Sequence, residues 1–193
     1  MSSRSRSRLL LALALVALVV VVGLVRSGQA PQSAAPSSAA IAAAFAGTPP
    51  ALAALHARAD KLIGGGLPGF DAQLRALRGH PVVVDIWGSW CAACRTELPS
   101  YQRVAAADGR QVAFVGIDVR DPPPAGASLL VRFPVTFPSW LDPHGRIAAS
   151  LGAGAGYPET VFIGRRGAVV ADHSGPFGTA AALQRDVNLY LLR

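Results

Sequence analysis

The chain has 193 residues, of which 51% are hydrophobic, and it carries a formal net charge of +7. This length suffices for one well-filled domain with an anchor and a linker, but hardly for two domains. The charge does not indicate nucleic-acid binding, because four of the 18 basic residues lie within the first 26 positions. Residues 27–193 hold 14 basic and 11 acidic residues without a basic stripe, and this excludes a phosphate-backbone footprint.

Residues 1–26 are predicted to form a membrane anchor. Positions 9–25 are 17 uninterrupted apolar residues, and as a helix they span ~26 Å, close to the ~30 Å hydrocarbon core. Three arginines precede the segment and one follows it, so the N-terminus is expected in the cytoplasm. A secretory signal is the alternative, although Pro31 follows its best cleavage site. Both interpretations place the remaining chain outside the cytoplasm, in a single-pass cell-membrane protein if the anchor is retained.

Residues 27–50 are rich in Ala, Ser and Pro and are predicted to be a linker that cannot fold alone. The folded domain is expected over residues 51–193. It begins with an amphipathic helix at 51–63, because apolar side chains recur there at helical spacing, and three glycines at 64–66 end it.

The remainder of the domain alternates between strand and helix patterns. Strands are predicted at 81–86, 111–119, 160–163 and 168–173, and helices at 91–107, 125–132, 145–151 and 179–192. Residues 164–167 form a hairpin turn, and Thr179 is expected to cap the last helix. This order predicts an α/β fold with a mixed sheet and helices on both faces.

The chain has two cysteines, Cys91 and Cys94. On the first turn of the 91–107 helix they are neighbours and can close a small disulfide ring. The helix N-terminus lowers the pKa of the first thiol, which makes Cys91 the expected nucleophile and Cys94 the resolving thiol. Zinc binding is the alternative, but the four histidines are isolated and no second cysteine pair exists. No metal and no cofactor are therefore expected.

Two segments carry a resemblance to a known family. VVVDIWGSWCAACRTELPSYQRV resembles the active-site segment of TlpA/ResA-type thioredoxin-like proteins, and GAGYPETVFIGRRGAVV resembles the segment with that family's cis-proline. The similarity covers about residues 66–192. It implies a thioredoxin-like fold and the activity of exported, membrane-anchored thiol–disulfide oxidoreductases.

The resemblance also implies roles for individual residues. Pro158 matches the cis-proline that faces the cysteines. Asp85 matches the buried aspartate of thioredoxins, which resembles a general base for the resolving thiol, and the alternative is a solvated or capping aspartate at a strand end. Glu97 matches a glutamate that tunes the thiol pKa values, or is an exposed helix residue.

Three aromatic residues and one acid are candidates for the substrate groove. Trp90, Tyr157 and Trp87 are expected to line its rim, although each could equally pack in the core. Glu159 matches the Pro-Glu-Thr of the cytochrome-maturation branch and is expected to aid partner recognition.

The resemblance favours reduction of disulfides in exported partner proteins, for example in cytochrome c biogenesis, with a membrane dithiol carrier supplying electrons. Ala92 and Ala93, between the cysteines, do not settle the direction of electron flow. An extracytoplasmic thiol oxidase is the first alternative, and a non-catalytic module that binds copper or a peptide is the second.

Overall fold

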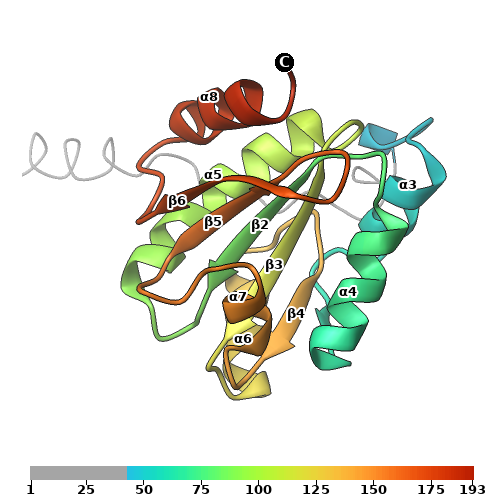
Figure 1. Ribbon diagram of the computed structural model, residues 1–193. Helices are drawn as coiled ribbons and strands as arrows, with labels where there is room; N and C mark the ends of the chain where they lie inside the picture. The colour runs from blue at the N-terminus through green and yellow to red at the C-terminus, as the bar shows by residue number, and fades with distance from the viewer. Residues whose placement is uncertain (1–42) are drawn as a thin grey trace, which may run out of the picture. The chain divides into compact units, whose positions relative to one another are not determined.

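The computed structural model describes residues 43–193 (Figure 1). The predicted anchor and most of the linker lie outside the described residues. Within residues 43–193, no helix has both the length and the apolar character that a membrane span requires.

A single six-stranded sheet forms the centre of the domain. Its strands are β1 (Leu62–Ile63), β2 (Val82–Trp87), β3 (Ala113–Val119), β4 (Ser139–Asp142), β5 (Glu159–Ile163) and β6 (Val169–Ser174). The spatial order is β1-β4-β3-β2-β5-β6. β1, β4, β3 and β2 run parallel, and β5 and β6 pair antiparallel, which confirms the predicted mixed sheet.

Helices cover both faces of this sheet (Figure 1). They are α3 (Pro50–His56), α4 (Gly66–Ala76), α5 (Ala92–Asp108), α6 (Pro123–Arg132), α7 (Arg146–Ser150) and α8 (Ala180–Tyr190). Side chains alternate along β2, so Val83 and Trp87 join the core formed with α5, α6 and α8. Val84 and Ile86 join the opposite core, formed with α3, α4 and α7. Every residue of β2, β3 and β5 is buried, as expected of strands covered on both faces.

The N-terminal part of the domain differs from the prediction. The first helix ends at His56, and Leu62 and Ile63 form β1, paired with Ser139 and Trp140 of β4. The glycines at 64–66 were expected to end a helix. Instead they lead into a new one, because Gly65, at φ 97°, is the N-cap of α4. Long-range strand pairing therefore overrides the local helical spacing in this segment.

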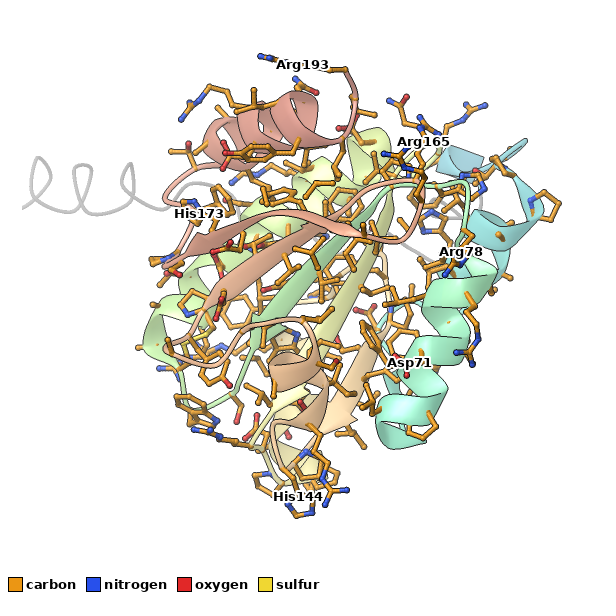
Figure 2. The ribbon with its side chains drawn as sticks, in the orientation of Figure 1. Asp71, Arg78, His144, Arg165, His173 and Arg193 are labelled. Atoms are coloured by element: carbon orange, nitrogen blue, oxygen red, sulfur yellow. A yellow bond between two sulfur atoms is a disulfide. The ribbon has the colours of Figure 1, made fainter. Side chains whose placement is uncertain are left out.

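The C-terminal part follows the prediction closely. The Thr179 hydroxyl accepts a hydrogen bond from the Ala182 amide and caps α8. β5 and β6 form the predicted hairpin, with a register shift between Phe162 and Ile163. Arg165, which lies at the hairpin turn and is labelled in Figure 2, donates a hydrogen bond to the Gly79 carbonyl at 3.1 Å.

One edge of the sheet gathers the segments that matter for chemistry. β2, β3 and β4 are parallel, so their carboxyl ends meet there, and β5 begins opposite Ile86. The loops that follow Trp87, Val119 and Asp142 lie at this edge beside the segment that precedes Glu159. The carboxyl edge of parallel strands is the usual place for a site in an open α/β sheet.

Candidate active site

The two cysteines form a disulfide at the start of α5. Their Cα atoms lie 5.3 Å apart. Cys91 is the N-cap of α5, and its Sγ accepts a hydrogen bond from the Cys94 amide at 3.1 Å. The capping sulfur therefore occupies the place where unpaired amides and the helix dipole favour negative charge.

The two sulfurs differ in access. Cys91 is 6% exposed, whereas Cys94 is completely buried. A partner molecule can reach only the first sulfur without displacing the helix. This asymmetry matches the predicted roles of attacking and resolving thiol.

The loop that leads into Cys91 is fixed from three sides. The Asp121 carboxylate accepts hydrogen bonds from the Ser89 amide and, at 2.8 Å, from its hydroxyl. The Arg95 guanidinium donates to the Ser89 carbonyl at 2.7 Å. The Trp90 indole donates to the Val119 carbonyl at 3.1 Å. These bonds hold the residues before the nucleophile in one position.

Trp90, which directly precedes Cys91, contacts Tyr157, the other aromatic candidate for the groove. Trp90 is 52% exposed, and its ring meets that of Tyr157 edge to face, with centroids 5.9 Å apart. The Arg120 guanidinium lies 5.9 Å from the centre of the Tyr157 ring. The Tyr157–Pro158 peptide bond is cis, as the resemblance implied.

Two other groove candidates are buried instead. Trp87 is completely buried and belongs to the core under α5, so its expected place on the rim was wrong. Glu159 is 6% exposed, and its carboxylate accepts a hydrogen bond from the Gly154 amide at 3.0 Å. Glu159 therefore anchors the loop before Pro158 rather than facing an incoming partner.

Asp85 lies in the middle of β2, between Val84 and Ile86, and is 1% exposed. It is therefore not the solvated or capping residue that was the alternative. Neither carboxyl oxygen has a hydrogen-bond partner. Burial, and secondarily the negative charge of Glu97, raise the pKa of Asp85 well above its usual value. The Asp85 carboxylate therefore has a higher affinity for a proton than an exposed aspartate has.

Glu97 is also buried, so it is not an exposed helix residue. One carboxyl oxygen accepts a hydrogen bond from the Phe177 amide at 2.9 Å, and the other has no partner. Burial raises the pKa of Glu97 to about 8, against the opposing effect of that hydrogen bond. Asp85 of β2 and Glu97 of α5 thus form a pair of buried acids between the sheet and this helix.

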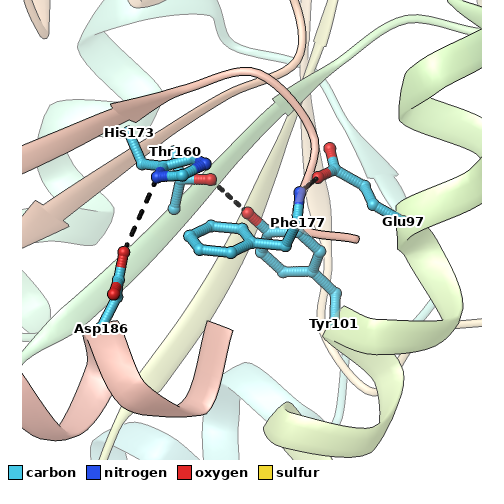
Figure 3. A network of polar contacts seen from close by, with 6 residues as sticks. All are labelled: Glu97, Tyr101, Thr160, His173, Phe177 and Asp186. Atoms are coloured by element: carbon cyan, nitrogen blue, oxygen red, sulfur yellow. Dashed lines mark hydrogen bonds and ion pairs between the residues drawn. The ribbon is translucent and has the colours of Figure 1, made fainter. Parts of the chain in front are cut away.

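Figure 3 shows the polar contacts on the Glu97 side of this pair. The Tyr101 hydroxyl pairs with the Thr160 hydroxyl, and Thr160 lies opposite Asp85 in the sheet register. The Phe177 ring packs between Tyr101 and His173, and His173 approaches Asp186 at 3.7 Å. The buried acids therefore have an ordered polar neighbourhood that extends to Asp186 in the middle of α8.

A third buried acid was missed by the sequence analysis. Asp118 lies opposite Trp87 in the register of β2 and β3, and it is completely buried without a hydrogen-bond partner. Burial, and secondarily the neighbouring Asp121, raise the pKa of Asp118 to about 8. The missed signal was a carboxylate inside an apolar strand, where burial is costly for a charged group without a partner.

The geometry defines a class of protein. A thioredoxin-like sheet with a C-x-x-C disulfide at the start of its central helix is typical of thiol–disulfide chemistry. Residues 64–172 match the model of the AhpC/TSA family, and the chain belongs to that family.

Individual relatives agree with this assignment. The DsbE homolog of Paracoccus denitrificans, a thiol:disulfide interchange protein, is 34% identical over 95 residues, which is 49% of this chain and 50% of the relative. The thiol:disulfide interchange protein HelX of Rhodobacter capsulatus is 31% identical over 66% of this chain and 71% of its own. The MTB dsbF structure, in mixed oxidized and reduced forms, has 31% identity and a TM-score of 0.55, covering 60% of this chain and 84% of that one. The chain spans about half the length of several curated relatives. The expected resemblance to thiol–disulfide oxidoreductases is thus confirmed.

Proposed function

We propose that this chain is a thiol–disulfide oxidoreductase that reduces disulfides in partner proteins through Cys91 and Cys94. One observation carries the proposal: the more accessible sulfur caps α5 and accepts the Cys94 amide hydrogen bond, while its partner sulfur is buried. Relatives named as thiol:disulfide interchange proteins support the same chemistry.

The first step is attack on the partner. In the reduced protein, the Cys91 thiolate attacks one sulfur of the partner disulfide. A mixed disulfide forms, and the partner's other sulfur leaves as a thiolate that takes up a proton. The Cys94 amide and the helix dipole stabilise the attacking thiolate before the reaction.

The second step releases the partner. Cys94 loses its proton, attacks the Cys91 sulfur and closes the intramolecular disulfide, and the second partner sulfur leaves as a thiolate that takes up a proton. Two electrons have then passed to the partner. Asp85 is the proposed acceptor of the Cys94 proton, because its burial gives its carboxylate a high proton affinity. Glu97 acts through Asp85 as a positioning and tuning residue.

The proposed setting is the outer side of the cell membrane. Its basis is the apolar segment at residues 9–25 with its flanking arginines. The substrates are disulfides of exported proteins, with those of maturing c-type cytochromes as the favoured example. Because that compartment supplies no electrons itself, a membrane dithiol carrier re-reduces the pair. Protease treatment of intact and of opened cells tests this setting, since only an exported domain is cleaved in both.

A disulfide-reduction assay tests the activity. The purified full chain, kept reduced by a dithiol, should reduce a protein disulfide, and Cys91→Ser should abolish this. Cys94→Ser should instead accumulate the mixed disulfide, because the resolving thiol is absent. Cys91→Ser with the rate of the unmodified chain would contradict the proposal.

The reduction potential of the pair tests the direction of electron flow. A reductase is expected near about −250 mV or lower, and an oxidase near about −130 mV. The proposed reductase requires the lower value. A value at the higher end would assign the chain to thiol oxidation.

A further inference from the structure

The exposed charge near Cys91 is of one sign. Three carboxylates lie at this edge of the sheet, and each is buried and already accepts hydrogen bonds from the protein. They are Asp121, bonded to Ser89, Asp142, bonded to the amides of Arg146 and Ala148, and Glu159, bonded to the amide of Gly154. They leave no exposed acceptor of their own for an incoming molecule.

Arg120 supplies exposed positive charge at the same edge. Within residues 43–193, the single ion pair joins His173 and Asp186, so the Arg120 guanidinium has no carboxylate partner there. Arg95 differs, because its guanidinium is half-buried and already donates to the Ser89 carbonyl. Arg120 is therefore the free cation beside the aromatic pair.

The backbone of Arg120 holds this side chain in an unusual conformation. Its φ is 54°, in the left-handed region, which costs a residue with a Cβ on the order of 1 kcal/mol. Among residues 43–193, only Asp60 shares this feature among non-glycine residues. The Arg120 amide donates to the Asp142 carbonyl at 3.1 Å, and its guanidinium lies over the Tyr157 ring. Such strain is concentrated at functional sites.

We propose that Trp90, Tyr157 and Arg120, named here the rim, receive the cysteine-containing segment of the partner protein. Arg120 binds the carboxylate of an aspartate or glutamate near the reacting cysteine of that segment. This inference rests on the proposed function and adds the class of substrate that the site prefers.

The order of the rim residues supports a polypeptide as the occupant. Trp90 directly precedes Cys91, so the partner's backbone must pass the exposed indole when its sulfur reaches the 6% exposed Cys91. The ring centroids of Trp90 and Tyr157 lie 5.9 Å apart, and the Arg120 guanidinium carbon lies 5.9 Å from the Tyr157 ring centroid. At about 3.3 Å per extended residue, the rim spans about four positions. The acidic residue is therefore expected within about four positions of the partner's cysteine.

Exchange kinetics with paired peptides test this preference. Each peptide carries one cysteine as a mixed disulfide with a chromophoric thiol, and either Asp or Asn three positions away. The reduced full chain should react about two- to fivefold faster with the Asp peptide, as expected of one exposed charge pair. Salt at about 0.5 M should bring the ratio close to one.

Variants assign the preference to one side chain. Arg120→Gln should remove the difference between the two peptides, and Arg120→Lys should keep part of it. Arg110→Gln is the matched control, because Arg110 is equally exposed but lies beyond the opposite end of α5, beside Gly47. Circular dichroism verifies that each variant is folded. An Asp-to-Asn ratio of one in the unmodified chain, or an unchanged ratio in Arg120→Gln, would overturn the proposal.

A binding measurement separates this inference from the redox function. Ser replaces Cys in both peptides, and binding to the oxidised chain is followed through the fluorescence of Trp90, the only one of the three tryptophans that is exposed. The Asp peptide should bind more tightly, and Arg120→Gln should abolish the difference. If this preference persists while no exchange occurs with any peptide, the redox function fails and the rim proposal stands. Loss of the preference in both measurements refutes the rim proposal alone.

Discussion

At the residue scale, the candidate site combines a surface sulfur with acids that have no contact with water. The Cys91 sulfur accepts a hydrogen bond from the Cys94 amide where the helix N-terminus favours negative charge, whereas Asp85 and Glu97 are held where a negative charge is costly. The arrangement therefore separates the group that attacks from the groups that store a proton. Burial raises the pKa values of Asp85 and Glu97, and this effect cannot be predicted from the spacing of these residues in the sequence alone.

Asp85→Asn is expected to slow the second step and spare the first. Asparagine keeps the shape of the side chain but cannot accept the Cys94 proton. The rate of partner release should fall by about 10²-fold, within the range of general-base effects, while formation of the mixed disulfide continues. Stopped-flow measurements between about pH 6 and 9 resolve the two steps. Equal release rates in the variant and the unmodified chain at every pH would exclude Asp85 as the base.

Much of the site could be predicted from the sequence. The cysteines, Asp85 and Pro158 follow from one short motif and one distant segment. Asp118 was missed although it also lies in an apolar strand. The misplacement of Trp87 and Glu159 has another cause, because side-chain direction at a strand end depends on register, which sequence does not define. Arg120 was not recognised because its place over Tyr157 arises from the meeting of two distant loops.

At the element scale, α6 is fitted closely to β3. A Cβ atom added at Gly126 would lie 2.0 Å from a carboxyl oxygen of Asp118. No side chain fits at that position while Asp118 stays in place. Gly126 therefore allows the helix to cover a buried acid that has no other room.

Gly126→Ala is expected to lower the free energy of unfolding by about 1–3 kcal/mol, the usual effect of overpacking a core. Chemical denaturation measures the loss. Gly178→Ala is the matched control, since nothing lies within 4 Å of a Cβ added there. Adding Asp118→Ala to the Gly126→Ala variant should recover part of the stability. A loss equal to that of the control would show that α6 is not tightly fitted.

The elements themselves were predictable where local signals were consistent. β2, α5 and α8 match their predicted ranges because apolar runs, an N-cap and a CxxC motif agree there. β1 and α4 were not predicted, because β1 exists only through pairing with β4, and three consecutive glycines suggest a break. β4 was not predicted either, because Pro138 directly precedes it and the strand is only four residues long.

At the scale of the whole molecule, the buried acids link the stability of the domain to pH. The pKa values of Glu97 and Asp118 are about 8 in the folded chain, against 4.5 and 3.8 as ordinary values. The folded state therefore holds protons that the unfolded chain has released between these limits. Their contribution to stability is fully present below about pH 4 and is lost as the pH rises through about 8.

The free energy of unfolding of the oxidised chain is therefore expected to fall between about pH 5 and pH 9. Asp118→Asn and Glu97→Gln should each flatten this dependence, because the neutral amides have no proton to lose. Urea denaturation at a series of pH values measures it. Asp172→Asn, at an exposed position on β6, should leave the slope unchanged. Identical slopes in all four proteins would contradict the assignment of raised pKa values.

The register shift between Phe162 and Ile163 has a consequence for the behaviour of the protein in concentrated solution. β6 is the outermost strand, and Val169 and Val170 are 48% and 50% exposed, so its free side offers backbone groups and apolar surface to another molecule. A bulge increases the local twist of an edge strand, and the twisted strand is a poor template for hydrogen-bonded pairing with a strand of another molecule. The irregular hairpin thus disfavours edge-to-edge aggregation of the domain, while the opposite end of β5 leads into the site.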